Sequence, residues 1–168
     1  NKDVLLVNCI EPNGILYVPA NYTGILTLSD VEIASIQQSD APATISTEAT
    51  ESSSKIEILG DVKVIATEEK MSAITGENIN IVGTGTLTAI AKGVDAFGIG
   101  GMDTKSININ GVKIAYVEGG CAYGVGSDTK YYKDAPEGGA AIGSVYNGAT
   151  ITLNNVTVNK AIGGSKAA

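Results

Sequence analysis

One repeated pattern constrains this chain more than any other feature. Five segments begin with an apolar–any–apolar stretch, continue through a turn-forming step and end in a second alternating stretch. They are Leu26–Ile33, Ile56–Val64, Ile79–Leu87, Ile107–Ile114 and Ile151–Val158. Alternating apolar and polar residues indicate half-buried strands. The Ser-Asp, Gly-Asp, Asn-Gly and Asn-Asn steps tolerate left-handed backbone angles and so predict a corner between two strands.

A second, shorter motif of small residues around an apolar residue lies between these segments. It occurs at Ala73–Gly76, Ala96–Gly100, Ala122–Gly126 and Ala141–Gly143, and it predicts a third strand in each turn of the chain. The five segments start 30, 23, 28 and 44 residues apart and all read in the same direction, whereas a sandwich of hairpins would show mirrored patterns. We therefore predict an all-β fold, a right-handed single-stranded parallel β-helix of about five rungs.

Stacked rungs predict columns of like side chains inside the coil. We expect one column of Ile56, Ile79, Ile107 and Ile151, and a second of Ile58, Ile81, Ile109 and Leu153. Recurring asparagines predict amide ladders or corner hydrogen bonds, at Asn80, Asn108, Asn110 and Asn154. Residues 1–168 form a single predicted domain. Because another Ala-Ile-Gly unit is due where the sequence stops, we expect it to be a segment of a longer protein.

Composition excludes several classes of function. The formal net charge of −7 and the pI of about 4.5 argue against nucleic acid and anionic membrane surfaces as partners. The sequence contains no run of about 18 apolar residues, so we expect no membrane insertion. It also contains no histidine, which excludes a Ser-His-Asp apparatus and the usual zinc sites. Cys9 and Cys121 are expected to lie several rungs apart as free thiols.

The segment richest in aromatic and polar residues is the predicted ligand-binding site. Its candidate residues are Tyr123, Asp128, Tyr131, Tyr132, Asp134 and Glu137. Tyrosine rings offer a flat apolar face to a sugar ring, and carboxylates can bind hydroxyl groups or a calcium ion. The alternative is a solvated loop that protrudes from a corner. Calcium is the candidate cofactor, and four corner aspartates are further candidate ligands, namely Asp30, Asp61, Asp95 and Asp103.

Several of these stretches resemble a known family. Leu26–Ile33, Ser72–Gly76, Asn80–Thr88 and Ala96–Gly101 look like bacterial carbohydrate-binding-domain-containing proteins. That family is typified by clostridial, calcium-containing parallel β-helices that bind polygalacturonate. Gly98–Gly101 followed by Ile107–Gly111 resembles repeats of large surface proteins in gut Firmicutes. The resemblance covers roughly residues 14–168, and it implies an extracellular or cell-surface location.

Three functions remain open from the sequence. We expect a non-catalytic module that binds acidic polysaccharide, with a polysaccharide or a host or cell-wall glycan as its partner. The first alternative is a structural stalk or adhesin segment without a ligand of its own. The second is a pectate-lyase-like enzyme, which we do not favour because the outward repeat positions are mainly Thr, Asn, Lys and Glu without a concentrated set of aspartates.

Overall fold

The computed structural model describes residues 2–19, 22–38, 55–120, 139–144 and 149–164, and within them it contains strands and no helix. No helix in this part of the chain could therefore cross a membrane. The strands are β1 (Val4–Val7), β2 (Ile10–Tyr17), β3 (Ile25–Ser29), β4 (Val31–Gln38), β5 (Lys55–Ile58), β6 (Asp61–Ala66), β7 (Ile74–Gly76), β8 (Asn78–Gly83), β9 (Thr86–Ala91), β10 (Ile99–Gly100), β11 (Ser106–Asn110), β12 (Lys113–Glu118), β13 (Ile142–Gly143), β14 (Thr150–Asn154), β15 (Thr157–Val158) and β16 (Ala161–Ile162). The all-β prediction is confirmed.

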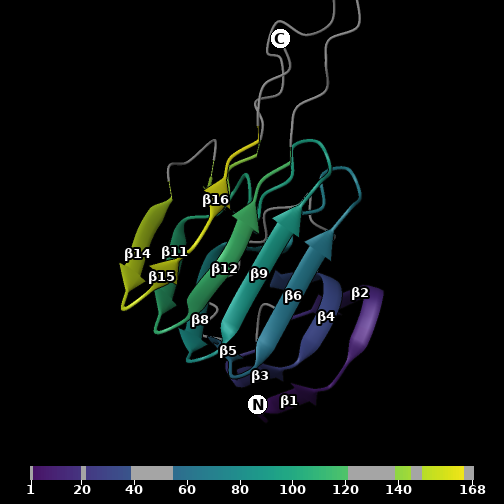
Figure 1. Cartoon of the computed structure of the whole chain (residues 1–168), viewed down its shortest axis with the longest axis vertical. Helices are drawn as coiled ribbons and strands as arrows, with labels where there is room; N and C mark the ends of the chain where they lie inside the picture. The colour runs from purple at the N-terminus through teal and green to yellow at the C-terminus, as the bar shows by residue number, and fades with distance from the viewer. Residues whose placement is uncertain (1, 20–21, 39–54, 121–138, 145–148, 165–168) are drawn as a thin grey trace, which may run out of the picture.

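The strands form two sheets in which neighbouring strands run parallel (Figure 1). The six-stranded sheet has the order β1-β3-β5-β8-β11-β14. The ten-stranded sheet has the order β13-β10-β7-β4-β6-β9-β12-β15, with β16 beside β12 and β2 beside β4. Strands that pair in space therefore come from successive repeats of the sequence, and this arrangement fits a parallel β-helix.

The ten-stranded sheet is strongly curled, because β4 pairs with two different strands along its length. Its first half pairs with β6 at Val31–Ile33, and its second half pairs with β7 at Ile36–Gln38. The short Ala-Ile-Gly motifs form β7, β10 and β13, in which Ile74, Ile99 and Ile142 lie in register. The predicted third strand is thus confirmed for these motifs. The motif at Ala122–Gly126 lies outside the described residues.

The core is a column of aliphatic side chains between the sheets. Leu26, Ile56, Ile81 and Ile109 pair across successive strands and are at most 3% exposed. Each buried aliphatic side chain contributes about 1.5–3 kcal/mol relative to an exposed one. Because the side chains of one layer are covered by the next, stability comes from stacking of the repeats.

The predicted columns were wrong at one step. Ile56 was expected beside Ile79, but it pairs with Ile81, a shift of two residues. The second strands set this register, since Val62 pairs with Leu87. Ile56 precedes Val62 by six residues, as Ile81 precedes Leu87. From β8 to β14 the predicted partners are correct: Ile79 with Ile107 and Ile107 with Ile151.

The corners use the residues that the sequence indicated. Asp30, Gly111 and Asn155 adopt positive φ angles of 55°, 79° and 51°.

The first strand of the six-stranded sheet, β1, was missed in the sequence, because Val4–Val7 is apolar throughout and lacks alternation. Cys9 is a free, partly buried thiol as expected, and Cys121 lies outside the described residues.

Candidate functional site

The predicted binding residues Tyr123, Asp128, Tyr131, Tyr132, Asp134 and Glu137 all lie in residues 121–138, outside the described part of the chain. The residues on either side of this segment are placed. The Gly139 amide donates a hydrogen bond to the Gly120 carbonyl oxygen at 2.8 Å. The chain therefore leaves the end of β12 and returns to the same corner.

Two of the four corner aspartates lie together. The Asp61 amide donates to Asp30 Oδ1 at 3.2 Å, and the Ser29 hydroxyl donates to Asp30 Oδ2 at 3.0 Å. Both carboxylate oxygens of Asp30 thus hold the corner of the coil. Within the described ranges, no group of three or more Asp, Glu, Cys or His side chains could hold a metal ion. Calcium binding stays a prediction.

The recurring asparagines lie in register. Asn80 pairs with Asn108, and Asn110 pairs with Asn154. Beside them, the Ser106 hydroxyl donates to Asn78 Oδ1 at 2.7 Å. Asn80 Oδ1 is buried and accepts no hydrogen bond from the described residues, so an amide ladder is not shown at this position.

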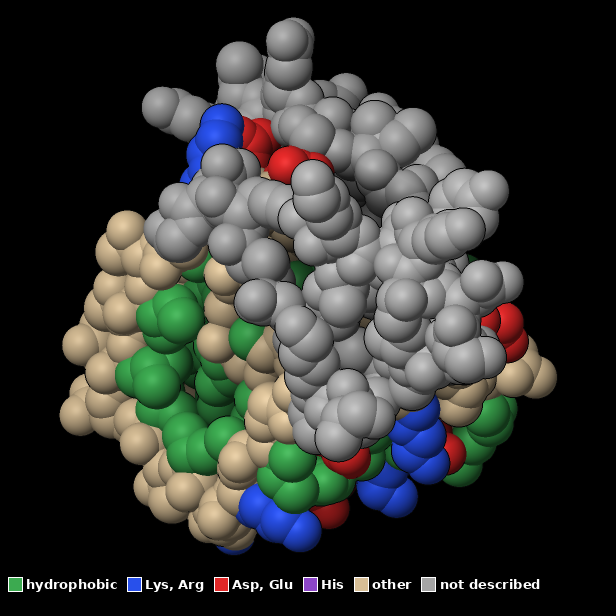
Figure 2. All heavy atoms as spheres, turned by 90° about the horizontal axis from the view of Figure 1, so that it is seen from above, with side chains coloured by type: hydrophobic (Ala, Val, Ile, Leu, Met, Phe, Trp, Pro, Cys, Tyr) green, Lys and Arg blue, Asp and Glu red, His purple; other side chains and the backbone are tan. Residues whose placement is uncertain are grey.

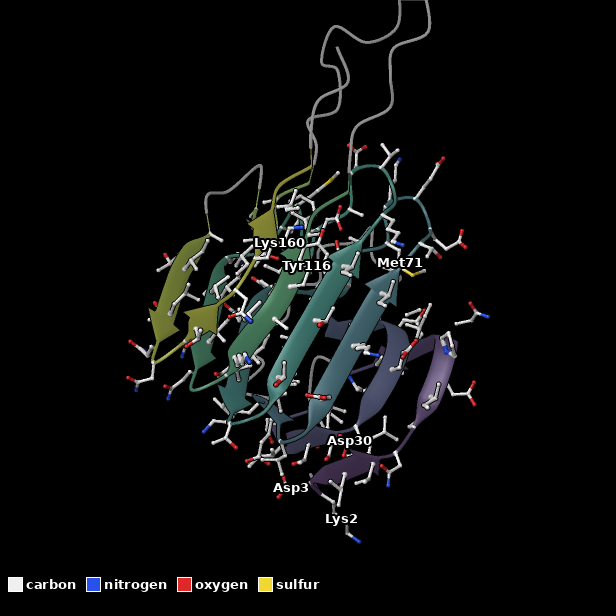
Figure 3. All side chains as sticks on the ribbon, viewed as in Figure 1. Lys2, Asp3, Asp30, Met71, Tyr116 and Lys160 are labelled. Carbon is white, nitrogen blue, oxygen red and sulfur yellow. The ribbon has the colours of Figure 1, made fainter. Side chains whose placement is uncertain are left out.

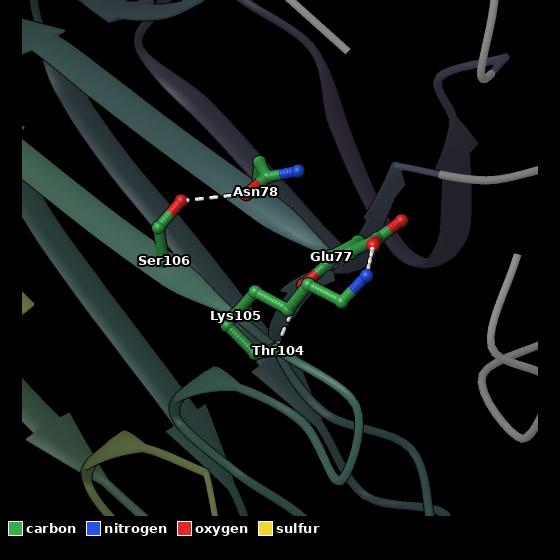
Figure 4. A network of polar contacts seen from close by, with 6 residues as sticks. Glu77, Asn78, Thr104, Lys105 and Ser106 are labelled. Carbon is green, nitrogen blue, oxygen red and sulfur yellow. Dashed lines mark hydrogen bonds and ion pairs between the residues drawn. The ribbon is translucent and has the colours of Figure 1, made fainter. Parts of the chain in front are cut away.

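A polar network joins two successive corners at the start of β8 and β11 (Figure 4). The ammonium group of Lys105 forms an ion pair with the Glu77 carboxylate, which raises the pKa of Lys105. The Lys105 and Ser106 amides both donate to the Glu77 carbonyl oxygen, at 2.7 and 3.2 Å. The Thr104 hydroxyl donates to the Gly76 carbonyl oxygen at 2.7 Å. Since most of these bonds go to backbone carbonyls, the network holds the corners in place.

A different surface gathers groups suited to a ligand. On the outward side of the ten-stranded sheet, one side chain per strand forms a line across β4, β6, β9 and β12 and ends beyond β15. The line consists of Glu32, Lys63, Thr88, Tyr116 and Lys160. Neighbouring strands lie about 4.8 Å apart, so the line presents polar and aromatic groups at a regular spacing.

Two side-chain contacts hold Tyr116 in place in this line. Its hydroxyl donates to Glu118 Oε2 at 2.7 Å, and Lys160 Nζ lies 5.0 Å from the centre of its ring. Figure 3 shows Tyr116 and Lys160 side by side near the end of β12. The hydrogen bond to Glu118, with partial burial and the negative charge of that carboxylate, raises the pKa of Tyr116. The ring is therefore held neutral between a carboxylate and a cation.

Parallel lines on either side complete the surface. One line contains Asp61, Thr86, Lys113 and Thr157, and the other contains Ile65, Ile90, Glu118 and Ile162. We define the Tyr116 face as the outward side chains around that ring, namely Thr86, Thr88, Lys113, Tyr116, Glu118 and Lys160. It combines two cations, a carboxylate, an aromatic ring and hydroxyl groups, and Ile90 and Ile162 border it.

Sequence reasoning missed this face because its residues are far apart in the chain. A β-bulge between Ile114 and Tyr116 also breaks the alternation that marks outward positions. One signal was available. Tyr116 and Lys160 are 44 residues apart, the same offset that separates Ile107 from Ile151 in the repeat.

The fold and this face define a class, that of all-β proteins built from parallel strands with an outward surface of aligned side chains. No protein-family model, curated protein or solved structure matches the chain.

Proposed function

We propose that this chain is a right-handed parallel β-helix of about five rungs that binds acidic polysaccharide without catalysis, in a secreted or cell-surface bacterial protein. The parallel pairing of successive repeats supports the fold. The resemblance of Leu26–Ile33 and Asn80–Thr88 to bacterial carbohydrate-binding β-helices agrees with the ligand class.

The Tyr116 face is the observation that carries the proposal. Lys113 and Lys160 offer cations to the carboxylates of an acidic sugar, while the ring of Tyr116 offers an apolar surface to the sugar ring. The strand spacing lets successive side chains meet successive sugars of an extended polysaccharide. Two carboxylates of the surface already have partners, since Glu32 pairs with Lys63 at 3.6 Å and Glu118 accepts from Tyr116. This favours binding over acid–base chemistry.

Binding to polygalacturonate in an affinity gel, with and without calcium, tests the proposal. We expect the wild-type chain to be retarded, and retardation to weaken as salt is added, because exposed charges are screened. Tyr116→Ala should weaken binding roughly fivefold to tenfold. Lys55→Ala, which removes an exposed lysine from the other sheet, is the matched control and should bind normally.

The Tyr131→Ala, Tyr132→Ala double variant separates the two candidate surfaces. If it loses binding while Tyr116→Ala does not, the ligand binds the 121–138 segment and the Tyr116 face is rejected. Release of unsaturated products, followed by absorbance, would instead establish a lyase.

A structural stalk is the second candidate, and the continuous columns of buried aliphatic residues favour it, because stacked layers make a stiff rod. A glycan array without any binding, run with and without calcium, would support the stalk and contradict the polysaccharide proposal.

A further inference from the structure

Asn-Gly pairs are chemically reactive, and the sequence contains three of them, at residues 13–14, 110–111 and 147–148. In such a pair the backbone nitrogen of the glycine attacks the side-chain amide carbon of the asparagine. A C–N bond forms, ammonia leaves, and a five-membered succinimide results. Water then opens this ring at either carbonyl, which gives aspartate or isoaspartate. Glycine favours the reaction because it has no Cβ to hinder the attack and its backbone turns easily.

The structure protects the pair formed by Asn110 and Gly111. The attack requires the glycine nitrogen to lose its proton and the asparagine to rotate, so a hydrogen-bonded amide must first open. Asn110 lies in register between Val82 and Asn154 on the two neighbouring strands. The Gly111 amide donates to the Asn154 carbonyl oxygen at 3.0 Å. Both residues of this pair are therefore held in the six-stranded sheet.

The pair formed by Asn13 and Gly14 lies in a β-bulge instead. The register of β2 with β4 is kept as far as Glu11 and resumes at Ile15, so the three residues between them have no partner in this pairing. Residues of a bulge are left out of the regular ladder. One of the three is Pro12, which has no amide hydrogen to donate. The pairing with β4 therefore does not fix Asn13 as the sheet fixes Asn110.

The bulge also lies at the surface of the protein. Among the described strands, β2 pairs with β4 alone, and the first four residues of β2, which include Asn13, are exposed. β2 is on the right in Figure 1 and stays on the right in Figure 2, where acidic and apolar side chains form the surface. Water for the second step therefore reaches Asn13 directly.

We propose that Asn13 is a site of spontaneous deamidation in the folded protein, and that the sheet protects Asn110 from the same reaction. The reaction consumes one water molecule and releases one molecule of ammonia. Its product adds a negative charge to a bulge that already carries Glu11. Isoaspartate also lengthens the backbone by one atom, which a segment outside the ladder accommodates more easily than a paired strand.

Mass spectrometry of the folded chain, incubated in mildly alkaline buffer, tests the proposal. Trypsin separates the two sites into peptides 3–55 and 106–113, fragmentation locates the modified residue, and a sample digested at time zero corrects for deamidation during digestion. We expect Asn13 to react at least about fivefold faster than Asn110, which is the factor that one protecting hydrogen bond supplies. Asn13→Gln should remove the modification at this position and leave the rate at Asn110 unchanged, because glutamine would have to form a larger ring.

The same incubation in urea shows whether the structure causes the difference. Both pairs then lose their neighbours, so Asn13 and Asn110 should react at similar rates. A folded chain in which Asn110 reacts as fast as Asn13 would overturn the proposal. So would a folded chain in which Asn13 stays intact for as long as it takes to react completely in urea.

Discussion

At the scale of single residues, Tyr116 shows how a repeat fold equips one side chain with neighbours from distant parts of the sequence. Glu118 comes from the same strand, whereas Lys160 comes from the next repeat. The carboxylate stabilises the neutral phenol by accepting its hydrogen bond and by opposing a second negative charge. The ring is thus fixed without being deeply buried.

The titration of Tyr116 gives a direct test of this arrangement. Its pKa is raised in the folded chain, so its contribution to stability is present below the ordinary tyrosine pKa and is lost as the pH rises through the folded-state value. Glu118→Ala should bring the pKa of Tyr116 down toward its ordinary value, measured by NMR of the tyrosine ring with Tyr116→Phe for assignment. Glu32→Ala removes another carboxylate of the same surface and should leave this titration unchanged. An unaltered titration in Glu118→Ala would contradict the hydrogen bond.

At the scale of strands, the register between β5 and β8 shows what a repeat pattern does and does not determine. The repeats indicated the strands, their direction and most corners, because alternation and turn residues are local signals. They did not indicate the two-residue shift of Ile56 to Ile81, since register depends on where the following strand is held. They also did not indicate the Tyr116 face, because the bulge at Ile114–Tyr116 and the stacking across repeats exist only in three dimensions. The predicted segment around Tyr131 remains a hypothesis.

Gly83 pairs with Ile58 at the end of the contact between β5 and β8. It has a φ of +129°, and a Cβ at this position would collide with the carbonyl oxygen of Ile58 on the neighbouring strand. Gly83→Ala should therefore destabilise the fold by about 1–3 kcal/mol, measured by urea unfolding. Gly163→Ala, at a glycine with no atom within 4 Å of the added Cβ, should change stability little. Equal stability of the two variants would show that the strand can slide to relieve the contact.

At the scale of the whole molecule, stability is distributed unevenly along the stack. Ile109 and Leu153 occupy the same column one strand apart, yet Ile109 is fully buried and Leu153 is 44% exposed. The middle layers are covered on both sides and the last layer on one. We therefore expect substitution by alanine to lower the free energy of unfolding more at Ile109 than at Leu153.

Urea unfolding of two alanine variants tests this difference. Ile109→Ala should lower the free energy of unfolding by about 2–5 kcal/mol, because it leaves a cavity in a packed layer. Leu153→Ala, which removes a side chain of the same size, should cost at most about 1 kcal/mol. Similar losses would show that Leu153 is packed as tightly as Ile109.

The connections that join the strands β6, β9 and β12 to β7, β10 and β13 differ in length. Residues 67–73 and 92–98 join β6 to β7 and β9 to β10 in seven residues each, while residues 119–141 make the equivalent connection from β12 to β13 in twenty-three. The closure entropy of a loop grows only slowly with its length, and the stacked strands on either side of these connections keep the same pairing. The exposed start of the first short connection, residues 67–70, is consequently a natural site for grafting a foreign peptide. The later parts of both short connections are not, because Ser72, Ala73, Ala96 and Phe97 are buried there and Phe97 donates its amide to Ser72 Oγ.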